Sequence, residues 1–366
     1  MSDIPPEVIE KIVDELDDDG ESLIACLSVS RAFHSRARYH LFQTVQLETD
    51  SDFYQFISLC DISPVILGLV QSLRIFPRTK AVPHLPLFPN VTSLHIGGHL
   101  HDEWQTNFPS TACLTLEELV FPSAQSFRSW ICAYPCLASL SVMSVVIYRL
   151  GSIGPYALAR GPPLEFLSLA YVSENLYDVF LGSPSKSISR FALHGIRKIR
   201  HTTMFPYDAT GISEILAVSR ETLQELDMRV QLFGPLQMFH ELVDISQVPT
   251  VNYRVASVKI PVSDSISWLS CCTDLKSDRP AYMQRLVIHV DLPDWLEELA
   301  FFQSLEPLDT ILTDPRYCVL KVVQFNLKGE ERHLSRENCQ VIRDAILMAL
   351  PKLQALGRLV VEDEII

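Results

Sequence analysis

The side chains with the clearest chemical potential are three histidines and a carboxylate, His95, His99, His101 and Asp102, which stand close together in the sequence. Imidazole and carboxylate groups are common ligands of divalent metals such as zinc. A glycine pair separates the first histidine from the others, so nothing in the sequence holds the four groups in a fixed geometry. Histidine is also an ordinary loop and interface residue. We therefore expect no metal and no cofactor here.

Other motifs that support catalysis are incomplete. His240-Glu241 begins like the helix of a zinc protease, but Asp244 stands where the second histidine ligand is required. Cys132 and Cys136 lack a second cysteine or histidine pair at zinc-finger spacing. The sequence contains no nucleophile elbow and no glycine-rich phosphate loop. We predict that the protein is not an enzyme.

Composition limits the class of partner. The 366 residues are 48% hydrophobic and 20% charged, with a net charge of −14. Nucleic-acid binding depends on clustered Lys and Arg, so this charge argues against a nucleic-acid partner. No apolar run reaches the length needed to span a membrane, and the first residues are acidic, unlike a secretory signal. Nine scattered cysteines suit reduced, buried thiols. We expect a cytoplasmic or nuclear protein.

The first forty residues predict short amphipathic helices. Pro6 suits the first turn of a helix, and the apolar residues that follow it recur at helical spacing. The run Asp17–Gly20 ends that helix. Two further helices follow, and the last carries several arginines.

These residues resemble the F-box family in order and spacing. Ile4-Pro5-Pro6-Glu7 matches its Leu-Pro-x-Glu entry, and Val29-Ser30-Arg31 with Phe33 matches its Val-Cys-Lys-x-Trp stretch. The resemblance covers about forty residues. It departs from the family in Ile4, which replaces Leu, in Ser30, which replaces Cys, and in Phe33, which replaces Trp. The resemblance implies that a Skp-type adaptor binds Ile4, Pro5, Glu7, Ile9, Ile12, Leu16, Leu23, Leu27, Val29, Ser30 and Phe33.

The rest of the chain repeats a short pattern, apolar-x-x-apolar-x-apolar, about every 28 residues, which is within the range of leucine-rich repeats. The last two apolar positions of the twelve copies are Val45/Leu47, Leu73/Ile75, Leu94/Ile96, Leu119/Phe121, Leu140/Val142, Leu167/Leu169, Phe191/Leu193, Leu226/Met228, Val258/Ile260, Leu286/Ile288, Val323/Phe325 and Leu359/Val361.

Between several copies the apolar spacing becomes helical. Helical stripes are Phe53 to Cys60, Phe127 to Tyr134, Trp295 to Phe302 and Val341 to Ala349. Strands that alternate with helices favour a parallel sheet. We therefore predict an α/β fold in which a three-helix F-box, residues 1–41, caps an irregular curved solenoid with a parallel sheet, residues 42–366. The solenoid resembles leucine-rich repeats, although the asparagine that the family places after each strand is absent. A non-repetitive α/β domain is the alternative.

The two resemblances together imply a substrate-receptor subunit of an SCF-type ubiquitin ligase, in which the helices bind the adaptor and the solenoid binds an unknown protein substrate. There are two alternatives. One is a protein-interaction scaffold outside any ligase, and the other is an α/β enzyme with an unrecognised site. Strand alternation puts mostly small and weakly charged residues on the open face in the early repeats (Ser93, His95, Ser139, Ser141, Phe166 and Ser168). The later repeats expose charged residues, which we predict to bind substrate: Arg190, Glu225, Asp227, Lys259, Arg285 and Arg358.

Overall fold

The computed structural model describes residues 5–77, 84–99, 102–149, 161–181, 193–203, 206–230, 243–255, 262–273, 280–291, 305–329 and 336–365. It is a mixed α/β structure with a large parallel sheet, as the sequence predicted. The chain forms two compact units, and β6 runs from one into the other. Unit 1 consists of residues 1–141 and 145–148, and unit 2 of residues 142–144 and 149–366. In the described part, no helix has the length and apolar character needed to cross a bilayer.

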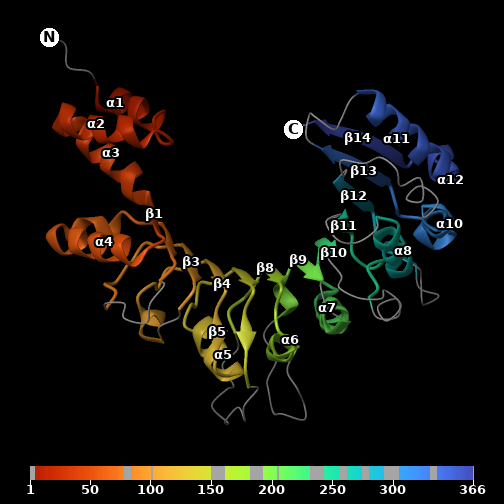
Figure 1. The fold of residues 1–366 in the computed structure, drawn as a ribbon, viewed down its shortest axis with the longest axis horizontal. Coiled ribbons are helices and arrows are strands. Elements are labelled where there is room, and N and C mark those ends of the chain that lie inside the picture. The colour runs from red at the N-terminus through yellow and green to blue at the C-terminus, as the bar shows by residue number, and fades with distance from the viewer. Residues whose placement is uncertain are drawn as a thin grey trace. The chain divides into compact units, whose positions relative to one another are not determined.

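Unit 1 begins with three helices and continues into strands that pair in parallel and in chain order (Figure 1). The N-cap of α4 is Thr49, which forms a capping box with Asp52. The helix therefore begins slightly earlier than Ser51, the residue that precedes its apolar stripe. The elements are α1 (Pro6–Asp14), α2 (Gly20–Val29), α3 (Arg31–Gln43), β1 (Thr44–Leu47), α4 (Asp50–Ile62), η1 (Pro64–Gly68), β2 (Ser72–Ile75), β3 (Ser93–Gly97), η2 (Asp102–Thr106), β4 (Cys113–Glu117), β5 (Val120–Phe121), α5 (Ala124–Cys132), β6 (Ser139–Met143) and β7 (Val146–Ile147).

In unit 2 each strand pairs in parallel with the next in the chain, and α6, α7, α8 and α10 lie along one side of the strands (Figure 1). We call the other side the open face. The elements are β8 (Phe166–Ala170), α6 (Glu174–Leu181), η4 (Leu193–Gly195), β9 (Lys198–Thr203), α7 (Pro206–Ser219), β10 (Glu225–Val230), β11 (Thr250–Val255), α8 (Val262–Thr273), β12 (Arg285–Asp291), α10 (Glu306–Leu312), η6 (Pro315–Tyr317), β13 (Val322–Gly329), α11 (Arg336–Ala349), α12 (Pro351–Ala355) and β14 (Leu359–Ile365).

Strands in both units begin with the same backbone hydrogen bonds. In unit 1 the amides of Thr92 and Ser93 both donate to the Gln71 carbonyl, at 2.9 and 3.1 Å. In unit 2 the amides of Gln224 and Glu225 donate to the Arg197 carbonyl, at 2.8 and 3.0 Å. The same arrangement recurs at Ala112 and Cys113 with Thr92, at Ala138 and Ser139 with Ala112, at Arg197 and Lys198 with Glu165, and at Lys321 and Val322 with Gln284.

Several strands also end in the same way, with a residue in the left-handed region. Gly98, Glu118, Ser144 and Tyr171 have φ of 76°, 53°, 54° and 55°, and each follows the last buried apolar residue of its strand by two positions. Only Gly98 adopts this conformation without a side-chain penalty. Backbone geometry therefore repeats where the sequence has no repeated asparagine.

Most of the predicted strands are present, but two copies of the pattern were assigned to the wrong residues, and one strand was not predicted. In the first, Leu114 and Leu116 of β4 occupy the inward positions in the large sheet that were predicted for Leu119 and Phe121. The left-handed residue after β4 redirects the chain, so β5 pairs instead with β7 in a separate two-stranded sheet.

The second misassigned copy lies near β9. Leu193, predicted to be a strand residue, belongs to η4, and Ile199 and His201 fill the strand positions. The strand that was not predicted is β11, whose buried residues are Val251 and Tyr253. The predicted copy at Val258 and Ile260 lies outside the described residues. A histidine at one apolar position and a tyrosine at another concealed the correct strands.

The predicted helical stripes at Phe53 to Cys60, Phe127 to Tyr134 and Val341 to Ala349 correspond to α4, α5 and α11. The stripe from Trp295 to Phe302 lies outside the described residues. Helix α3 continues to Gln43, two residues beyond the boundary expected at residue 41.

Candidate functional site

The first three helices form a small hydrophobic core of their own. Ile9 and Val13 of α1 pack with Leu23 and Cys26 of α2 and with Ala37 of α3. All five side chains are buried. The partly buried residues that pack around them are Leu16, Leu27, Phe33 and Leu41. We call residues 5–43 the helical segment.

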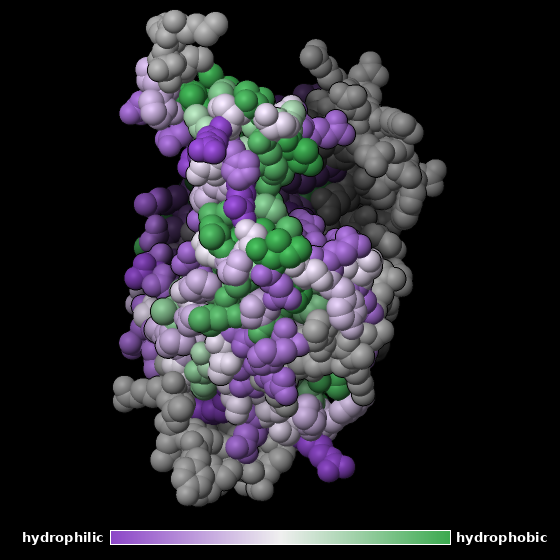
Figure 2. All heavy atoms as spheres, turned by 90° about the vertical axis from the view of Figure 1, so that its left-hand side faces the viewer, coloured by the Kyte–Doolittle hydropathy of each residue, from purple (hydrophilic) through white to green (hydrophobic). Residues whose placement is uncertain are grey.

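The same helices carry a second set of apolar side chains that point away from this core. Val8 and Ile12 of α1 are 44% and 45% exposed, and Ile24 and Val29 of α2 are 60% and 65% exposed. Val8 and Ile12 are four residues apart, so they lie on one side of α1. Figure 2 shows apolar atoms gathered over the part of unit 1 that these helices form. We call these four residues the apolar face.

Some of the predicted adaptor-binding residues are exposed, and others belong to the core of the helical segment. Pro5, Ile12 and Val29 are exposed, whereas Ile9 and Leu23 are buried and hold the helices together. The half-buried group is Leu16, Leu27 and Phe33, on the side of the core. Glu7 is exposed in the first turn of α1, Ser30 is exposed at the start of α3, and Ile4 lies outside the described residues.

An ion pair joins α1 to α3. Arg36 Nη2 donates to Asp14 Oδ2 at 3.0 Å, and His40 Nε2 lies 2.7 Å from Asp14 Oδ1. The bond from the Arg36 guanidinium, followed by that from His40, lowers the pKa of Asp14 from 3.8 to about 2. The ends of the two helices therefore stay joined in moderately acidic solution.

Polar contacts also join α3 to the first strands of unit 1. Gln71 Nε2 donates to the Tyr39 hydroxyl at 3.1 Å, and Gln43 Nε2 donates to Gln71 Oε1 at 3.3 Å. The Arg38 guanidinium donates to the Ser63 hydroxyl. Since Gln71 directly precedes β2, the helical segment packs on the start of the sheet.

On the open face of unit 2, several predicted substrate-binding residues are paired with their neighbours. Glu225 accepts hydrogen bonds from Lys198 and Asn252, each at 2.8 Å. Asp227 accepts from Arg200 at 3.0 Å. These carboxylates therefore connect adjacent strands.

The predicted basic residues have different surroundings. Arg285 is exposed and donates to Gln324 Oε1 at 2.6 Å. Arg358 is half-buried, and its guanidinium lies 3.5 Å from the Tyr317 carbonyl oxygen. Arg190 and Lys259 lie outside the described residues. The predicted register requires both arginines to lie outside the core, and neither of them is buried.

The early strands match the expectation for the open face at most positions. Ser93 is exposed, and the half-buried group is His95, Ser139, Ser141 and Phe166. Ser168 differs from the prediction, since it is buried at 8% exposure.

Two arginines on the open face were missed by the sequence analysis. Arg229 of β10 and Arg254 of β11 are directly opposite each other in the register of the sheet. Arg229 lies one position beyond the short apolar pattern. Arg254 was missed because the strand was assigned to residues after it. The alternation of Val251 and Tyr253 with polar residues was the signal that could have located it.

The histidine cluster of unit 1 forms no metal site in the described structure. His95 Nε2 is 2.7 Å from Glu117 Oε2, and burial lowers the pKa of His95 despite that bond. His99 is exposed and His101 lies outside the described residues. The residues that are described contain no group of three side chains that could hold a metal ion.

An open hollow lies near His95, where β1, β2, β3 and β4 end. Its volume is about 590 Å³, and Arg74, Phe76 and His99 are among the residues that line it. The Arg74 guanidinium lies 4.7 Å from the centre of the Phe76 ring. Gly97 allows this ring to lie across β3, because a Cβ atom there would be 2.2 Å from it.

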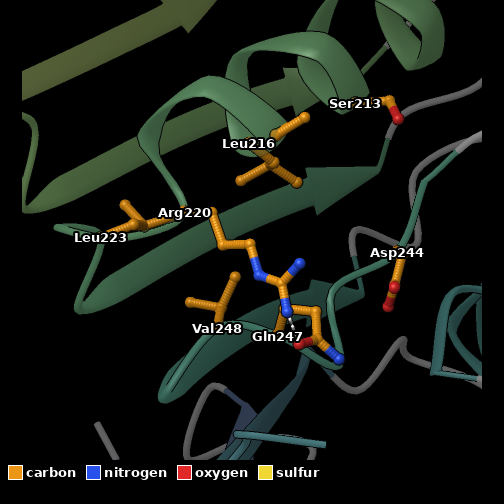
Figure 3. A pocket seen from close by; sticks show the side chains of 8 residues that line it. Ser213, Leu216, Arg220, Leu223, Asp244, Gln247 and Val248 are labelled. Atoms are coloured by element: carbon orange, nitrogen blue, oxygen red, sulfur yellow. Dashed lines mark hydrogen bonds between the residues drawn. The ribbon is translucent and has the colours of Figure 1, made fainter. Parts of the chain in front are cut away.

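A smaller hollow of about 190 Å³ lies in unit 2 (Figure 3). Arg220 crosses it and donates to Gln247 Oε1 at 2.6 Å, while Asp244 points elsewhere and accepts from the amide of Ser246. Leu216, Leu223 and Val248 supply apolar walls.

A polar network is buried in unit 2. The Tyr177 hydroxyl is 2.8 Å from His201 Nε2 and donates to Asp208 Oδ1 at 2.9 Å. All three residues are at most 4% exposed, and burial lowers the pKa of His201 to about 3. Gly211 leaves room for the Tyr177 ring, which a Cβ atom would approach to 2.2 Å. This depth suits a structural role.

Comparison with protein-family models and with curated proteins finds no match for the chain. The features that indicate function are therefore the residues and surfaces themselves, of which the apolar face and the open face are the most distinctive.

Proposed function

We propose that this chain is a non-catalytic substrate-receptor subunit of an SCF-type ubiquitin ligase. In this role the helical segment binds a Skp-type adaptor, and the later strands, arranged as an irregular leucine-rich-repeat-like solenoid, bind a protein substrate. The F-box resemblance of residues 4–42 suggests the adaptor, and the recurrent strand entries in both units support the repeat.

The observation that carries the proposal is the apolar face. The apolar stripe of α1 is wider than its contact with the core, so one edge of the stripe is buried and the other edge is exposed. Ile9 and Val13 satisfy the core, so Val8 and Ile12 contribute nothing to it. Exposed apolar side chains one helical turn apart are typical of a helix that binds a partner. This arrangement favours a docking surface over a simple cap.

The contacts of α3 with Gln71 favour a second candidate, in which the helices only cap the first strands of a protein-interaction scaffold. Such a cap shields the end of a repeat structure. The capping role involves α3, whereas adaptor binding involves α1 and α2. The two roles are compatible, and adaptor binding decides between ligase subunit and scaffold.

The test is isothermal titration calorimetry of the full chain with a purified Skp-type adaptor. The double variant Pro5→Ala with Ile12→Ala should weaken binding by about tenfold or more, because apolar anchors at an interface centre contribute strongly. The control is Ile62→Ala, which removes an isoleucine of α4 that is 83% exposed. This control should bind the adaptor normally.

Circular dichroism should show that the double variant retains its helices. Absence of adaptor binding by the wild-type chain would reject the ligase role and leave the scaffold. Equal affinities for the wild type and the folded double variant would show that the apolar face is not the binding surface.

A further inference from the structure

The open hollow of unit 1 lies where four adjacent parallel strands end. Glu48 follows β1, Phe76 follows β2, Gly98 follows β3 and Glu118 follows β4, and all four residues line it. Because the strands are parallel, these ends lie together at one edge of the sheet. The volume of about 590 Å³ is within the range of ligand sites, roughly 300–1,000 Å³.

Arg74 of β2 lines this hollow without a polar partner. Its Nε atom is buried and makes no hydrogen bond, and within the described part of the chain its side chain forms no ion pair. The guanidinium lies 4.7 Å from the centre of the Phe76 ring. A ring supplies no oxygen or nitrogen acceptor, so the donors of this guanidinium lack the carboxylate or carbonyl partners that they normally have.

Phe76 and its neighbours fix the position of this guanidinium. The ring of Phe76 packs edge-on against His95, with 5.0 Å between the ring centres. Gly97 makes room for the ring, because a Cβ atom there would be 2.2 Å from it. His95 Nε2 lies 2.7 Å from Glu117 Oε2, so that carboxylate is already paired. The cation is therefore held in place before a ligand arrives, which lowers the entropic cost of binding.

Two carboxylates stand on either side of this cation. Glu48 and Glu118 are exposed, and within the described residues neither side chain makes an ion pair. They follow the outer two of the four strands, and neighbouring strands are about 4.8 Å apart, so about 14 Å separates them. The hollow thus presents one central cation between two anions. Its electrostatic complement is a ligand with one anion between two cations.

We propose that this hollow binds an extended protein segment in which one Asp or Glu lies between two basic residues. The carboxylate of the segment accepts hydrogen bonds from the Arg74 guanidinium, and the basic side chains pair with Glu48 and Glu118. Alternate residues of an extended chain point to the same side, about 6.6 Å apart. Basic residues two positions before and two positions after the acid therefore span about 13 Å, which matches the separation of the two carboxylates.

Other ligands fit these charges less well. A phosphomonoester carries almost two negative charges and would be repelled by both Glu48 and Glu118. A nucleic acid would meet the same carboxylates and a net charge of −14. A small-molecule site normally encloses most of its ligand, whereas this hollow is open.

This inference extends the proposed function, on which it rests for identifying the bound segment as a substrate. It places a recognition site on the first strands as well as on the later ones. Its test contains no adaptor. Failure of peptide binding would leave adaptor binding unaffected, and failure of adaptor binding would leave the peptide site intact.

The experiment measures fluorescence anisotropy of labelled peptides with the full chain at low salt. The reference peptide is Gly-Lys-Gly-Glu-Gly-Lys-Gly with both ends blocked. One variant peptide has Gln in place of Glu, and another has Gln in place of both Lys. A further peptide exchanges the signs, with Lys between two Glu, and the last has phosphoserine at the centre. The reference should bind most tightly, and replacement of its Glu should weaken binding by about tenfold or more, as expected for lost charge-assisted hydrogen bonds.

Substitutions in the protein assign each charge of the peptide to its partner. Arg74→Gln should bind the Glu and Gln peptides equally, because the guanidinium that distinguishes them is absent. Glu48→Gln combined with Glu118→Gln should keep that distinction but lose the preference for the two lysines. The matched control is Arg220→Gln, which removes the same charge from an exposed arginine of unit 2. It should keep both preferences and change affinity by less than about twofold, because distant surface charges are screened.

Circular dichroism checks that each variant is folded. The comparison of the Glu and Gln peptides on the unaltered protein needs no variant, so it decides the proposal even if Arg74→Gln does not fold. No binding of the reference peptide at about 1 mM, or equal binding of the Gln peptide, would overturn the proposal. Preference for the sign-exchanged or the phosphoserine peptide would do the same. So would a folded Arg74→Gln protein that still distinguishes Glu from Gln.

Discussion

The helical segment and the strands of unit 2 use apolar and polar residues in opposite ways. The helical segment has a core of five small or medium side chains and leaves Val8, Ile12, Ile24 and Val29 exposed. Unit 2 buries a hydrogen-bonded tyrosine, histidine and aspartate behind its sheet and covers its open face with charged residues. The helical segment leaves apolar side chains exposed, whereas unit 2 places charged side chains on its open face and has one polar network within an otherwise apolar core.

This difference has consequences for binding and stability. An apolar surface gains most of its binding energy from area removed from water, so salt affects it little. A charged surface gives specificity and responds to salt and to substitution of single charges. The helical segment therefore suits a constant partner, and the open face suits selection among ligands. The next three experiments test this contrast, beginning with the largest effect.

Leu23→Ala should destabilise the helical segment far more than Ile12→Ala. Leu23 is 1% exposed, and truncation of a buried leucine costs about 3 kcal/mol. Ile12 is 45% exposed and should cost less than about 1 kcal/mol. Hydrogen exchange of the amides in α1 to α3 measures both effects. Similar loss of protection in the two variants would mean that Ile12 belongs to the core.

Unit 2 should lose stability as the pH falls below about 6.5, the usual pKa of histidine. His201 in the folded state takes up a proton only near pH 3, whereas the unfolded chain does so near pH 6.5. The unfolded state therefore binds more protons between these values, and the free energy of unfolding should fall by on the order of 1 kcal/mol per pH unit. Calorimetric melting from neutral pH to roughly pH 5 measures this slope.

His201→Leu is the matched control for this pH dependence. Leucine fits the apolar position of β9 and does not titrate, and the Tyr177 hydroxyl keeps its bond to Asp208. The variant should show a shallower slope than the wild type over the same range. An identical slope would assign the acid sensitivity to another group.

The helical segment should respond to acid only at much lower pH, which is the smallest effect of the three. Because the folded pKa of Asp14 is about 2 and its ordinary value is 3.8, the ion pair stabilises the segment fully above pH 3.8. That contribution is lost as the pH falls towards 2. Arg36→Met should return the Asp14 pKa towards 3.8 in an NMR titration. A pKa that stays near 2 would identify His40 as the main cause.

Much of the sheet could be predicted from the sequence. Alternating apolar residues located strands such as β2, β10 and β12, because one face of each must be buried. The failures occurred where a strand carries a polar or aromatic residue at a buried position. His201 is tolerated in the core because Tyr177, from another element, hydrogen bonds to it. No local pattern in the sequence contains that contact.

The candidate surfaces could be predicted only in part. Helical spacing identified Val8, Ile9, Ile12 and Val13 as apolar residues of one helix, but it could not separate those that face the core from those that face solvent. That division depends on where α2 and α3 pack. Strand alternation kept Asp227 and Arg285 out of the core, as observed, but Ser168 is buried and Arg254 was missed with its strand.

The sequence by itself determined the alternation of strands and helices and the presence of a short helical segment before them, because these depend on local periodicity and turn chemistry. The tertiary structure decided which side chains are paired across strands. Arg200 and Arg254 are similar in the sequence, but the register places Asp227 beside Arg200 and Arg229 beside Arg254. Charge pairing between strands depends on this register, and the register is fixed by contacts between residues far apart in the chain.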